Sequence, residues 1–401
     1  MKVFVIAGEP SGDHLGAALM AGLQKLQPGV RFSGIGGAMM QAQGLVSVFP
    51  MTELSVMGLA EILPRYAQLK RRIRQTAAEI AAQAPDVVIT IDSPDFCLRV
   101  LTLARAANPA LRTVHYVAPS VWAWRPGRAR RMARVVDHVL ALLPFEPAYM
   151  HAAGMSCDFV GHPVVAEPTA TAPEIHAFRA AQGLTPETPL ILVLPGSRRG
   201  EIARLAPRFG AALEQVLARH PQARVVVPSV AAQATFMRDQ IARWPGAPLL
   251  LDAATTSPAQ KRAAFAAADS ALAASGTVSL ELAAARTPMV IAYDFNPFTR
   301  FLIRRLFRLD TATLVNLVSE TRAVPECLLD DCTPACIIPR LTRLLEDPQT
   351  RGAQLEAMDL TVTRLGRGQE DPGLRAARSV LGWLEKAPTH PVHLAENTPG
   401  G

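Results

Sequence analysis

The sequence predicts an α/β protein built from two doubly wound, Rossmann-like domains. Short runs of apolar residues recur along the chain, and most are followed by a segment with helical spacing. Such runs are typical of strands buried on both faces of a parallel sheet. Many of them end in turns rich in Gly, Pro and Ser, and the alternation restarts near residue 190. A chain of 401 residues agrees with two domains of roughly 100–200 residues each.

The composition limits the classes of partner. Hydrophobic residues make up 49% of the chain and charged residues 19%, which is a globular composition. The formal net charge of +7 favours an anionic partner such as a nucleotide or an acidic membrane. Aromatic residues are only 5% and are not interleaved with a basic patch, so we expect no nucleic-acid partner. We expect the five cysteines to be free thiols in a reducing compartment, without a metal site.

The first strand is expected at residues 3–7, and residues 8–14 (GEPSGDH) turn the chain into a helix. This opening is typical of a doubly wound domain. The glycines at positions 8, 12 and 16 do not match the G-x-G-x-x-G pattern of dinucleotide-binding proteins. Close approach of a sugar or lipid headgroup at Gly12 is one interpretation, and a simple tight turn is the other.

Residues 54–74 combine apolar side chains at helical spacing with a basic second half. A basic amphipathic helix often lies on an anionic membrane surface. The pattern also fits a helix that packs its apolar stripe on the sheet and exposes its basic face to solvent. The residues expected to contact a membrane are Leu63, Tyr66, Leu69, Arg71 and Arg72.

A buried strand expected at residues 86–91 delivers Asp92 and Asp95 to the carboxyl edge of the sheet. Ligands of open α/β sheets bind outside these strand ends. Either carboxylate is therefore a candidate general base. Helix capping is the alternative role for each of them.

The loop after the strand expected at residues 113–117 carries Trp122, Trp124 and several arginines. Tryptophan and arginine suit contacts with a sugar phosphate, although core packing explains the tryptophans almost as well. His162 is a further candidate, but a lone histidine in a loop is more often structural.

The strand expected at residues 190–194 (LILVL) ends in a Pro-Gly-Ser turn, and Arg198 begins the segment that follows. A glycine turn, exposed amides at a helix start and an arginine together suit a diphosphate. An ordinary connection between a strand and a helix is the alternative.

A second anion site is predicted at residues 274–281 (ASGTVSLE). Ser275 is a suitable N-cap, and Gly276 would let a ligand reach the amides of the first turn. Thr277 and Glu281 are four residues apart and share a helix face. Diphosphate at the helix start and ribose hydroxyls on Glu281 would use all of these residues, and a plain capped helix is the alternative.

Residues 296–308 (NPFTRFLIRRLFR) repeat the basic amphipathic pattern. Two such helices favour peripheral binding to an anionic membrane. The contacts expected here are Phe298, Arg300, Phe301, Arg304 and Arg305. No uncharged apolar stretch of 18 residues occurs that would span a bilayer.

Together these motifs resemble those of the lipid-A-disaccharide synthase family, which are inverting glycosyltransferases of bacterial outer-membrane lipid synthesis. The tryptophan-containing segment is much more specific than any Gly-rich loop. The matching segments run in order over nearly the whole chain: GEPSGD at 8–13, DSPDF at 92–96, HYVAPSVWAWR at 115–125, LLPFE at 142–146, GHP at 161–163, LPGSR at 194–198, ASGTVSLE at 274–281 and PFT at 297–299.

The resemblance implies a glycosyltransferase-B fold, in which two doubly wound domains face a cleft. It also implies a reaction that needs no cofactor and no metal ion. The family joins UDP-2,3-diacylglucosamine to 2,3-diacylglucosamine 1-phosphate through a β-1,6 linkage and releases UDP. Its members are cytoplasmic and peripheral on the inner face of the inner membrane.

Carried over residue by residue, the resemblance assigns the UDP donor to Ser197, Arg198, Ser275, Gly276, Thr277, Glu281 and Asn316. Val315 departs from the proline that usually precedes this asparagine in the family. The acceptor is assigned to Ser11, Gly12, Trp124 and His162. Its 6-hydroxyl would lose a proton to Asp95 or Asp92, of which Asp95 is preferred.

We therefore expect an acceptor-binding and membrane-facing domain at residues 1–170 and a UDP-sugar-binding domain at residues 190–345. The Pro- and Ala-rich residues 171–189 are expected to form a linker, and residues 346–401 C-terminal helices with a frayed tail. A UDP-sugar epimerase of the same fold and a non-catalytic peripheral membrane protein are the alternative functions. Homo-oligomerisation stays open.

Overall fold

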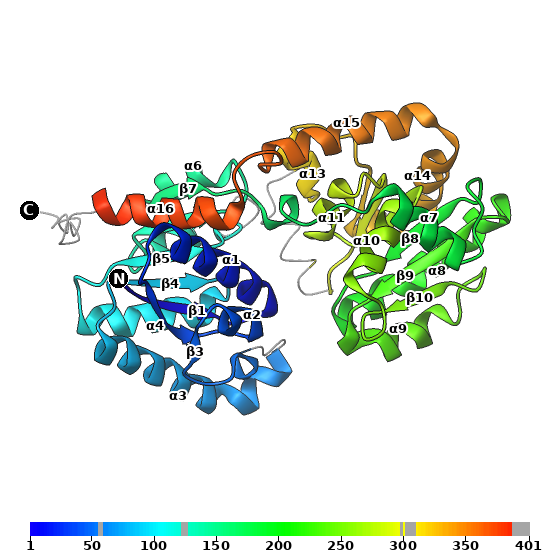
Figure 1. The fold of residues 1–401 in the computed structure, drawn as a ribbon. Helices are drawn as coiled ribbons and strands as arrows, with labels where there is room; N and C mark the ends of the chain where they lie inside the picture. Colours follow the sequence, from blue (N-terminus) through cyan, green and yellow to red (C-terminus); the bar gives the residue numbers. More distant parts are fainter. Residues whose placement is uncertain (55–58, 122–126, 297–299, 301–309, 387–401) are drawn as a thin grey trace, which may run out of the picture. The chain divides into compact units, whose positions relative to one another are not determined.

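The computed structural model describes residues 1–54, 59–121, 127–296, 300 and 310–386, without the side chains of residues 59–66. The chain forms two compact units (Figure 1). Unit 1 consists of Met1–Ala166 and Gly368–Gly401, and unit 2 consists of Glu167–Arg367.

Unit 1 is built on a parallel sheet, which has seven strands among the described residues, in the order β3-β2-β1-β4-β5-β6-β7. β1 and β4 are buried along nearly their whole length, as their continuous apolar runs predict. The strands are β1 (Lys2–Ala7), β2 (Arg31–Ile35), β3 (Val46–Ser47), β4 (Val87–Ile91), β5 (Thr113–Tyr116), β6 (His138–Ala141) and β7 (Ser156–Phe159).

Helices and short 3-10 turns connect these strands. The helices of unit 1 are α1 (Pro10–Leu26), α2 (Ala38–Ala42), α3 (Leu59–Gln83), α4 (Pro94–Ala107), α5 (Gly127–Met132), α6 (Glu146–His151) and α16 (Pro372–Lys386). The 3-10 turns are η1 (Met51–Glu53) and η2 (Pro163–Val165).

The last described helix, α16, returns to unit 1 and lies along α1 (Figure 1). The two helices approach closely because both carry glycine at the contact. A Cβ built on Gly22 would lie 2.7 Å from the carbonyl oxygen of Gly373. The C-terminal block expected at residues 346–401 is therefore divided, since α15 (Pro348–Arg364) belongs to unit 2 and α16 to unit 1.

Unit 2 repeats the architecture with a parallel sheet in the order β10-β9-β8-β11-β12-β13 among the described residues. Its strands are β8 (Leu190–Leu194), β9 (Arg224–Ser229), β10 (Leu249–Asp252), β11 (Ser270–Ala273), β12 (Met289–Tyr293) and β13 (Glu326–Leu328). Besides α15, its helices are α7 (Ala172–Ala181), α8 (Arg199–Arg219), α9 (Ala234–Ile241), α10 (Pro258–Ala267), α11 (Val278–Ala284), α13 (Leu314–Ser319) and α14 (Pro334–Glu346), with 3-10 turns η3 (Ala231–Gln233) and η4 (Leu329–Asp331).

The structure places a helix where we expected a linker. α7 begins in a capping box, in which the Thr171 hydroxyl accepts the Glu174 N–H and the Glu174 carboxylate accepts the Thr171 N–H. Arg179 of α7 donates a hydrogen bond to the carbonyl of Ala267 in α10 at 2.8 Å. These contacts make α7 part of unit 2. The linker was predicted from the Pro- and Ala-rich composition, whereas the Thr-x-x-Glu pattern at residues 171–174 indicates a helix start.

Both sheets have the same internal order. Numbered along the chain within each sheet, the first six strands run 3-2-1-4-5-6, which is the doubly wound order. The predicted fold class is thus confirmed. Ligands of such sheets bind at the carboxyl ends of the two strands where the order reverses. Those strands are β1 and β4 in unit 1, and β8 and β11 in unit 2.

Candidate functional site

In unit 1, the two acidic and glycine-rich motifs meet at the switch point of the sheet. Ala7 of β1 pairs with Ile91 of β4, so the turn after residue 7 and the turn after residue 91 lie side by side. The absence of a side chain at Gly8 leaves room for Ser93, because a Cβ built on Gly8 would lie 2.5 Å from Ser93 Oγ. The structure therefore brings together residues 8–12 and residues 92–95, which the sequence separates by about eighty positions.

The same edge carries an unusual backbone. Asp92, Ser93 and Val117 adopt positive φ angles of 51°, 43° and 85°. A positive φ is a genuine outlier for a β-branched residue such as Val117. Strained residues of this kind tend to cluster where function requires a particular geometry. Their position at the ends of the adjacent strands β4 and β5 makes this edge the candidate functional part of unit 1.

Asp95 lies in the first turn of α4, and its side chain is 93% exposed. The Nη2 atom of Arg128 lies 3.9 Å from Asp95 Oδ1. Asp92 is half-buried at the strand end, and its N–H donates to the carbonyl of Tyr116. Asp95 is thus the more accessible carboxylate, as general-base chemistry on a bound alcohol requires.

Three of the residues that are expected to bind the acceptor are Ser11, Gly12 and Trp124. Ser11 is exposed in the first turn of α1. Gly12 is buried, and a Cβ there would lie 3.4 Å from Ala7 Cβ and 3.5 Å from the carbonyl oxygen of Ile91. Gly12 thus faces β1 and β4 at ordinary van der Waals distance, and its contact with the acceptor stays a prediction. Trp124 lies outside the described residues.

His162 is also a structural residue. Its side chain is buried, and Nδ1 accepts a hydrogen bond from the Val164 N–H at 3.2 Å at the start of η2. Burial lowers the pKa of His162 to about 4, so the imidazole is neutral near pH 7. The expected acceptor contact of His162 is replaced by this capping role.

Two carboxylates that sequence reasoning did not single out hold the loops around this edge. Asp13 is buried and accepts the N–H groups of Gly37, Met39 and Met40, which caps α2. Glu146 is buried and accepts the N–H groups of Leu142 and Leu143 through one oxygen. The final acids of the GEPSGD and LLPFE motifs are thus structural. Residue type alone does not predict that Asp13 and Glu146 are buried, because acidic side chains are mostly exposed.

In unit 2, the predicted diphosphate turn follows β8 directly. Ser197 and Arg198 are exposed, and α8 begins at Arg199. Gly196 has a φ of 113°, and a Cβ there would lie 2.7 Å from Glu201 Cβ, so this position requires glycine. Glu201 accepts the Arg198 N–H at 3.3 Å, and Arg198 Nη1 lies 3.1 Å from Glu201 Oε1. Glu201 was missed from sequence, although an acid three residues into a helix is a capping signal.

The second predicted motif lies beside this turn. The Ala274 N–H donates to the carbonyl of Leu194, which places residues 275–277 next to residues 195–198. Gly276 and Thr277 are exposed, and no described heavy atom lies within 4 Å of a Cβ built on Gly276. Glu281 is half-exposed and forms an ion pair of 2.8 Å with Lys261. A ligand therefore has access to Gly276, Thr277 and Glu281.

Ser275 is not the N-cap that we expected. α11 begins at Val278 with Thr277 before it, and neither supplies a side-chain cap. The Ser275 hydroxyl donates instead to the carbonyl of Ala312 at 3.2 Å. This bond fixes the loop after β11 rather than the helix start.

Asn316 is fully buried inside unit 2. Its Nδ2 donates to Thr311 and to the carbonyl of Val324, and its Oδ1 accepts the Val324 N–H. The amide is thus engaged by the protein at both ends. This geometry does not support direct contact between Asn316 and the UDP-sugar, because no polar atom of its side chain reaches the surface.

The predicted membrane contacts divide into three groups. Arg71 is exposed on α3 beside Arg74. Leu69 packs against the core of unit 1, and Arg72 binds both oxygens of Glu53 at 2.6 and 2.8 Å with its guanidinium over the Phe49 ring. Membrane contact is therefore wrong for Leu69 and Arg72. The side chains of Leu63 and Tyr66, and residues Phe298, Phe301, Arg304 and Arg305, lie outside what the structure describes.

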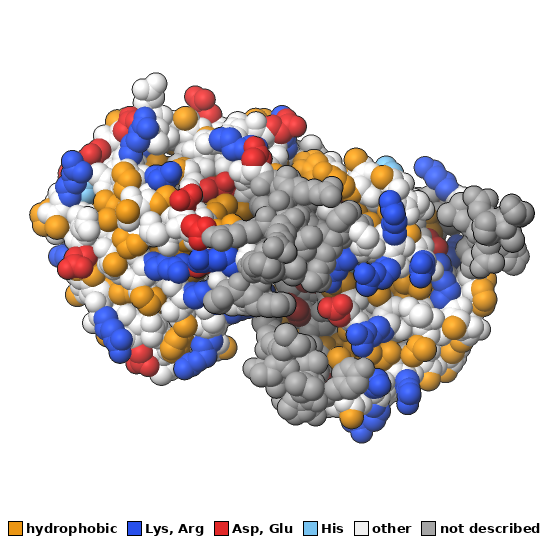
Figure 2. All heavy atoms as spheres, turned by 180° about the vertical axis from the view of Figure 1, so that it is seen from behind, with side chains coloured by type: hydrophobic (Ala, Val, Ile, Leu, Met, Phe, Trp, Pro, Cys, Tyr) orange, Lys and Arg blue, Asp and Glu red, His pale blue; other side chains and the backbone are white. Residues whose placement is uncertain are grey.

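Arg300 is likewise paired within unit 2. It binds the carboxylate of Asp294, which is 2% exposed, and its Nη1 lies 3.1 Å from Asp330. A guanidinium held by two carboxylates is poorly suited to a lipid phosphate, so the expected membrane contact of Arg300 is wrong. No helix among the described residues has an apolar stretch long enough to cross a membrane. Lys and Arg side chains are spread over both units on the face shown in Figure 2.

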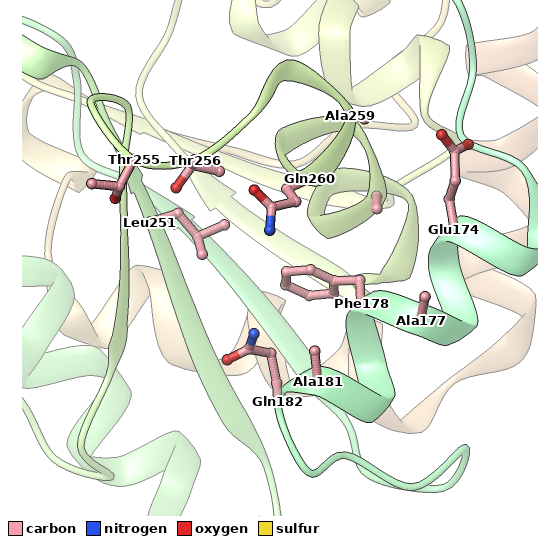
Figure 3. A pocket seen from close by; sticks show the side chains of 11 residues that line it. Glu174, Ala177, Phe178, Ala181, Gln182, Leu251, Thr255, Thr256, Ala259 and Gln260 are labelled. Carbon is pink, nitrogen blue, oxygen red and sulfur yellow. The ribbon is translucent and has the colours of Figure 1, made fainter.

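A separate pocket of about 520 Å³ lies in unit 2 between α7, α10 and the end of β10 (Figure 3). Phe178 and Leu251 supply much of its apolar lining, and the amides of Gln182 and Gln260 its polar part. None of the predicted donor residues lines it. It is therefore distinct from the strand ends that carry the diphosphate motifs.

Comparison with known proteins identifies the family. The sequence profile of the family described as lipid-A-disaccharide synthetase matches residues 3–371. A lipid-A-disaccharide synthase from Ruegeria pomeroyi is 62% identical over 385 residues, which cover 95% of each chain.

Solved structures support the fold. The UDP-GlcNAc 2-epimerase from Neisseria meningitidis bound to UDP-GlcNAc superposes with a TM-score of 0.66 at 14% identity, covering 96% of this chain and 100% of that chain. The calicheamicin glycosyltransferase CalG4 gives a TM-score of 0.52 at 17% identity, covering 96% and 99%. At such identities the likeness concerns the fold alone. It confirms the fold class that the sequence predicts.

Proposed function

This chain belongs to the lipid-A-disaccharide synthetase family, and we propose that it joins two acylated glucosamines into the lipid A disaccharide. The donor is UDP-2,3-diacylglucosamine, the acceptor is 2,3-diacylglucosamine 1-phosphate, and the products are the β-1,6-linked disaccharide 1-phosphate and UDP. One observation carries the proposal. Four of the motifs shared with the family (GEPSGD, DSPDF, LPGSR and ASGTVSLE) follow the strands at the switch points of the two sheets, where doubly wound folds bind ligands.

Unit 2 would bind the UDP moiety of the donor. The exposed guanidinium of Arg198 and the N-terminal end of α8 offer positive charge to a diphosphate. As the sugar leaves, negative charge grows on the β-phosphate, and donors already held in place stabilise that charge. Thr277 and Ser197 add hydroxyls beside the same turn.

Glu281 would accept hydrogen bonds from the ribose hydroxyls. Its carboxylate is half-exposed, and Lys261 already holds it in one orientation at 2.8 Å. A carboxylate with two oxygens can accept from a diol while keeping an ion pair with a lysine. Ser275 and Asn316 would act indirectly, by fixing the loop after β11 and the segment near Thr311.

Unit 1 would supply the general base. The Asp95 carboxylate takes the proton of the acceptor 6-hydroxyl as that oxygen attacks C1 of the donor sugar. The new C1–O bond forms on the face opposite the breaking bond to UDP, so the configuration at C1 is inverted. The proton passes from Asp95 to water after UDP leaves. Proton transfer to a positioned side chain contributes about 10²–10⁴-fold to a rate.

We further propose that the protein works at the cytoplasmic face of the inner membrane. Both substrates carry acyl chains, which partition into a bilayer rather than into water. The exposed Arg71 and Arg74 of α3 would attract anionic headgroups, each basic side chain contributing about 1 kcal/mol near such a surface.

The test is a transfer assay with the purified protein and both acylated substrates in mixed micelles. We expect one UDP and one disaccharide per turnover, detected by mass spectrometry. UDP without disaccharide would contradict the transfer. Epimerisation of water-soluble UDP-GlcNAc without any disaccharide would favour a UDP-sugar epimerase. Vesicle binding with no reaction of either kind would favour a non-catalytic membrane protein.

A further inference from the structure

The carboxyl end of β12 is tied to the first turns of α8, the helix that begins at the diphosphate turn. Tyr293, the last residue of β12, donates a hydrogen bond from its hydroxyl to Glu201 Oε1 at 2.9 Å. Building on the donor site proposed above, we infer that Glu201 and Tyr293 are positioning residues, which hold residues 195–198 in the conformation that receives a nucleoside diphosphate.

Glu201 is the centre of this arrangement. Its carboxylate accepts the Arg198 N–H at 3.3 Å and the Tyr293 hydroxyl, and it lies 3.1 Å from Arg198 Nη1. The side chain is only 12% exposed. It also packs under Gly196, where any side chain would collide with it. One carboxylate thus sets both the backbone of the turn and the resting place of the arginine.

A second contact makes the connection rigid. Arg208 Nη1 lies 2.8 Å from Asp294 Oδ2, and Arg204 Nε donates to the Asp294 carbonyl at 3.3 Å. Residues 201, 204 and 208 lie on one face of α8, because residues three and four apart are neighbours on a helix. The end of β12 therefore fixes α8 at three positions along its first turns, so that its N-terminus cannot tilt independently of the sheet.

The chemistry of Tyr293 suits this role. Burial and then the neighbouring Glu201 raise the pKa of Tyr293 to about 12, so the phenol stays protonated and can donate. A carboxylate one helical turn from a diphosphate site would repel the ligand and compete for Arg198. The Tyr293 hydroxyl and the Arg198 N–H occupy the carboxylate oxygens, which weakens that competition.

We expect the variants of Tyr293 and Glu201 to weaken UDP binding to different extents. Tyr293→Phe removes one hydrogen bond to a charged acceptor and leaves the ring in place. We expect it to weaken UDP binding in calorimetry about tenfold, and to raise the KM for the UDP-sugar by a similar factor with kcat changed less than about threefold. Glu201→Gln, which keeps the shape and one acceptor oxygen, should give a smaller loss than Glu201→Ala.

Controls separate this inference from the function that it rests on. Tyr149→Phe, at an exposed tyrosine of unit 1, should leave UDP affinity unchanged. If Arg198→Ala abolishes UDP binding while Tyr293→Phe and Glu201→Gln stay within about twofold of wild type, the positioning role is wrong and the donor site stands. If wild-type protein fails to bind UDP, the proposed function itself is overturned. A loss in Tyr293→Phe confined to kcat, with KM constant, would indicate reduced active fraction and contradict the inference.

Discussion

Gly8 lies so close to Ser93 that a Cβ on the glycine would come within 2.5 Å of the serine hydroxyl. The two residues follow the adjacent strands β1 and β4, and Ser93 has a φ of 43°. The glycine-rich turn and the Asp-Ser-Pro-Asp turn therefore share one close contact, which couples the proposed acceptor motif to the segment that carries Asp92 and Asp95.

Gly8→Ala tests this contact. The methyl group must displace Ser93 and with it the turn that holds Asp95, so we expect turnover to fall by at least about tenfold. The melting temperature should fall by about 2–12 °C, as for a strain of about 1–3 kcal/mol. Gly382→Ala in α16 is the matched control, because nothing lies within 4 Å of its added methyl in the described residues. Equal turnover for both variants would rule out a role for the contact.

Asp95→Asn should lower kcat by about 10²–10⁴ without loss of stability, because the side chain is 93% exposed. Asp92→Asn is the matched comparison. Asparagine tolerates the positive φ at position 92, so this variant removes charge without adding strain. A large fall for Asp92→Asn with a near-normal Asp95→Asn would reverse our assignment of the base.

Three buried histidines of unit 1 should make its stability depend on pH. Burial lowers the pKa values of His115, His138 and His162 to about 4 from an ordinary 6.5. Between these values the unfolded chain binds protons that the folded unit does not. The free energy of unfolding is therefore highest above pH 6.5 and falls as the pH is lowered toward 4.

Scanning calorimetry at pH 7.5, 6 and 5 measures this dependence. We expect the unit 1 transition to move to lower temperature at each step. His162→Asn should flatten the slope, because asparagine does not titrate and its Oδ1, bonded to Cγ as Nδ1 is, can accept the Val164 N–H. An unchanged slope in that variant would show that His162 contributes nothing to the dependence.

The membrane proposal predicts a difference between basic residues. Charge reversal at the exposed Arg71 and Arg74 should weaken binding to anionic vesicles by at least about tenfold at low salt. The same reversal at the exposed Arg224 and Arg243 of unit 2 changes net charge equally and should have a small effect. Sedimentation with vesicles measures both. Similar losses in both variants would mean that net charge, rather than α3, drives binding.

The sequence was informative wherever a local pattern determines the position of a residue. Apolar runs located the strands, and the structure places Asp92 directly after β4, Arg198 in the turn after β8 and Glu281 in the helix that follows β11. His162 has the structural role that is more common for a lone histidine in a loop, because its side chain is buried and accepts the Val164 N–H. Burial is set by the packing of distant segments, which no local pattern reveals.

Contacts between distant residues explain the remaining differences. Tyr293 and Glu201 are 92 residues apart, so neither could be identified from spacing. Arg72 and Arg300 looked like membrane residues because their partners, Glu53 and Asp294, lie on other elements. Burial alone would raise the pKa of the Asp294 carboxyl, but hydrogen bonds from Arg300 and Arg208 outweigh it and lower the pKa. A basic pattern in sequence thus does not distinguish a free cation from a paired one.

The most direct test of the central claim is a crystal structure of the protein with UDP. The account predicts the diphosphate on residues 195–198 and the start of α8, with Arg198 in contact and the ribose on Glu281. UDP bound elsewhere, with Ser197, Arg198 and Glu281 untouched, would contradict it.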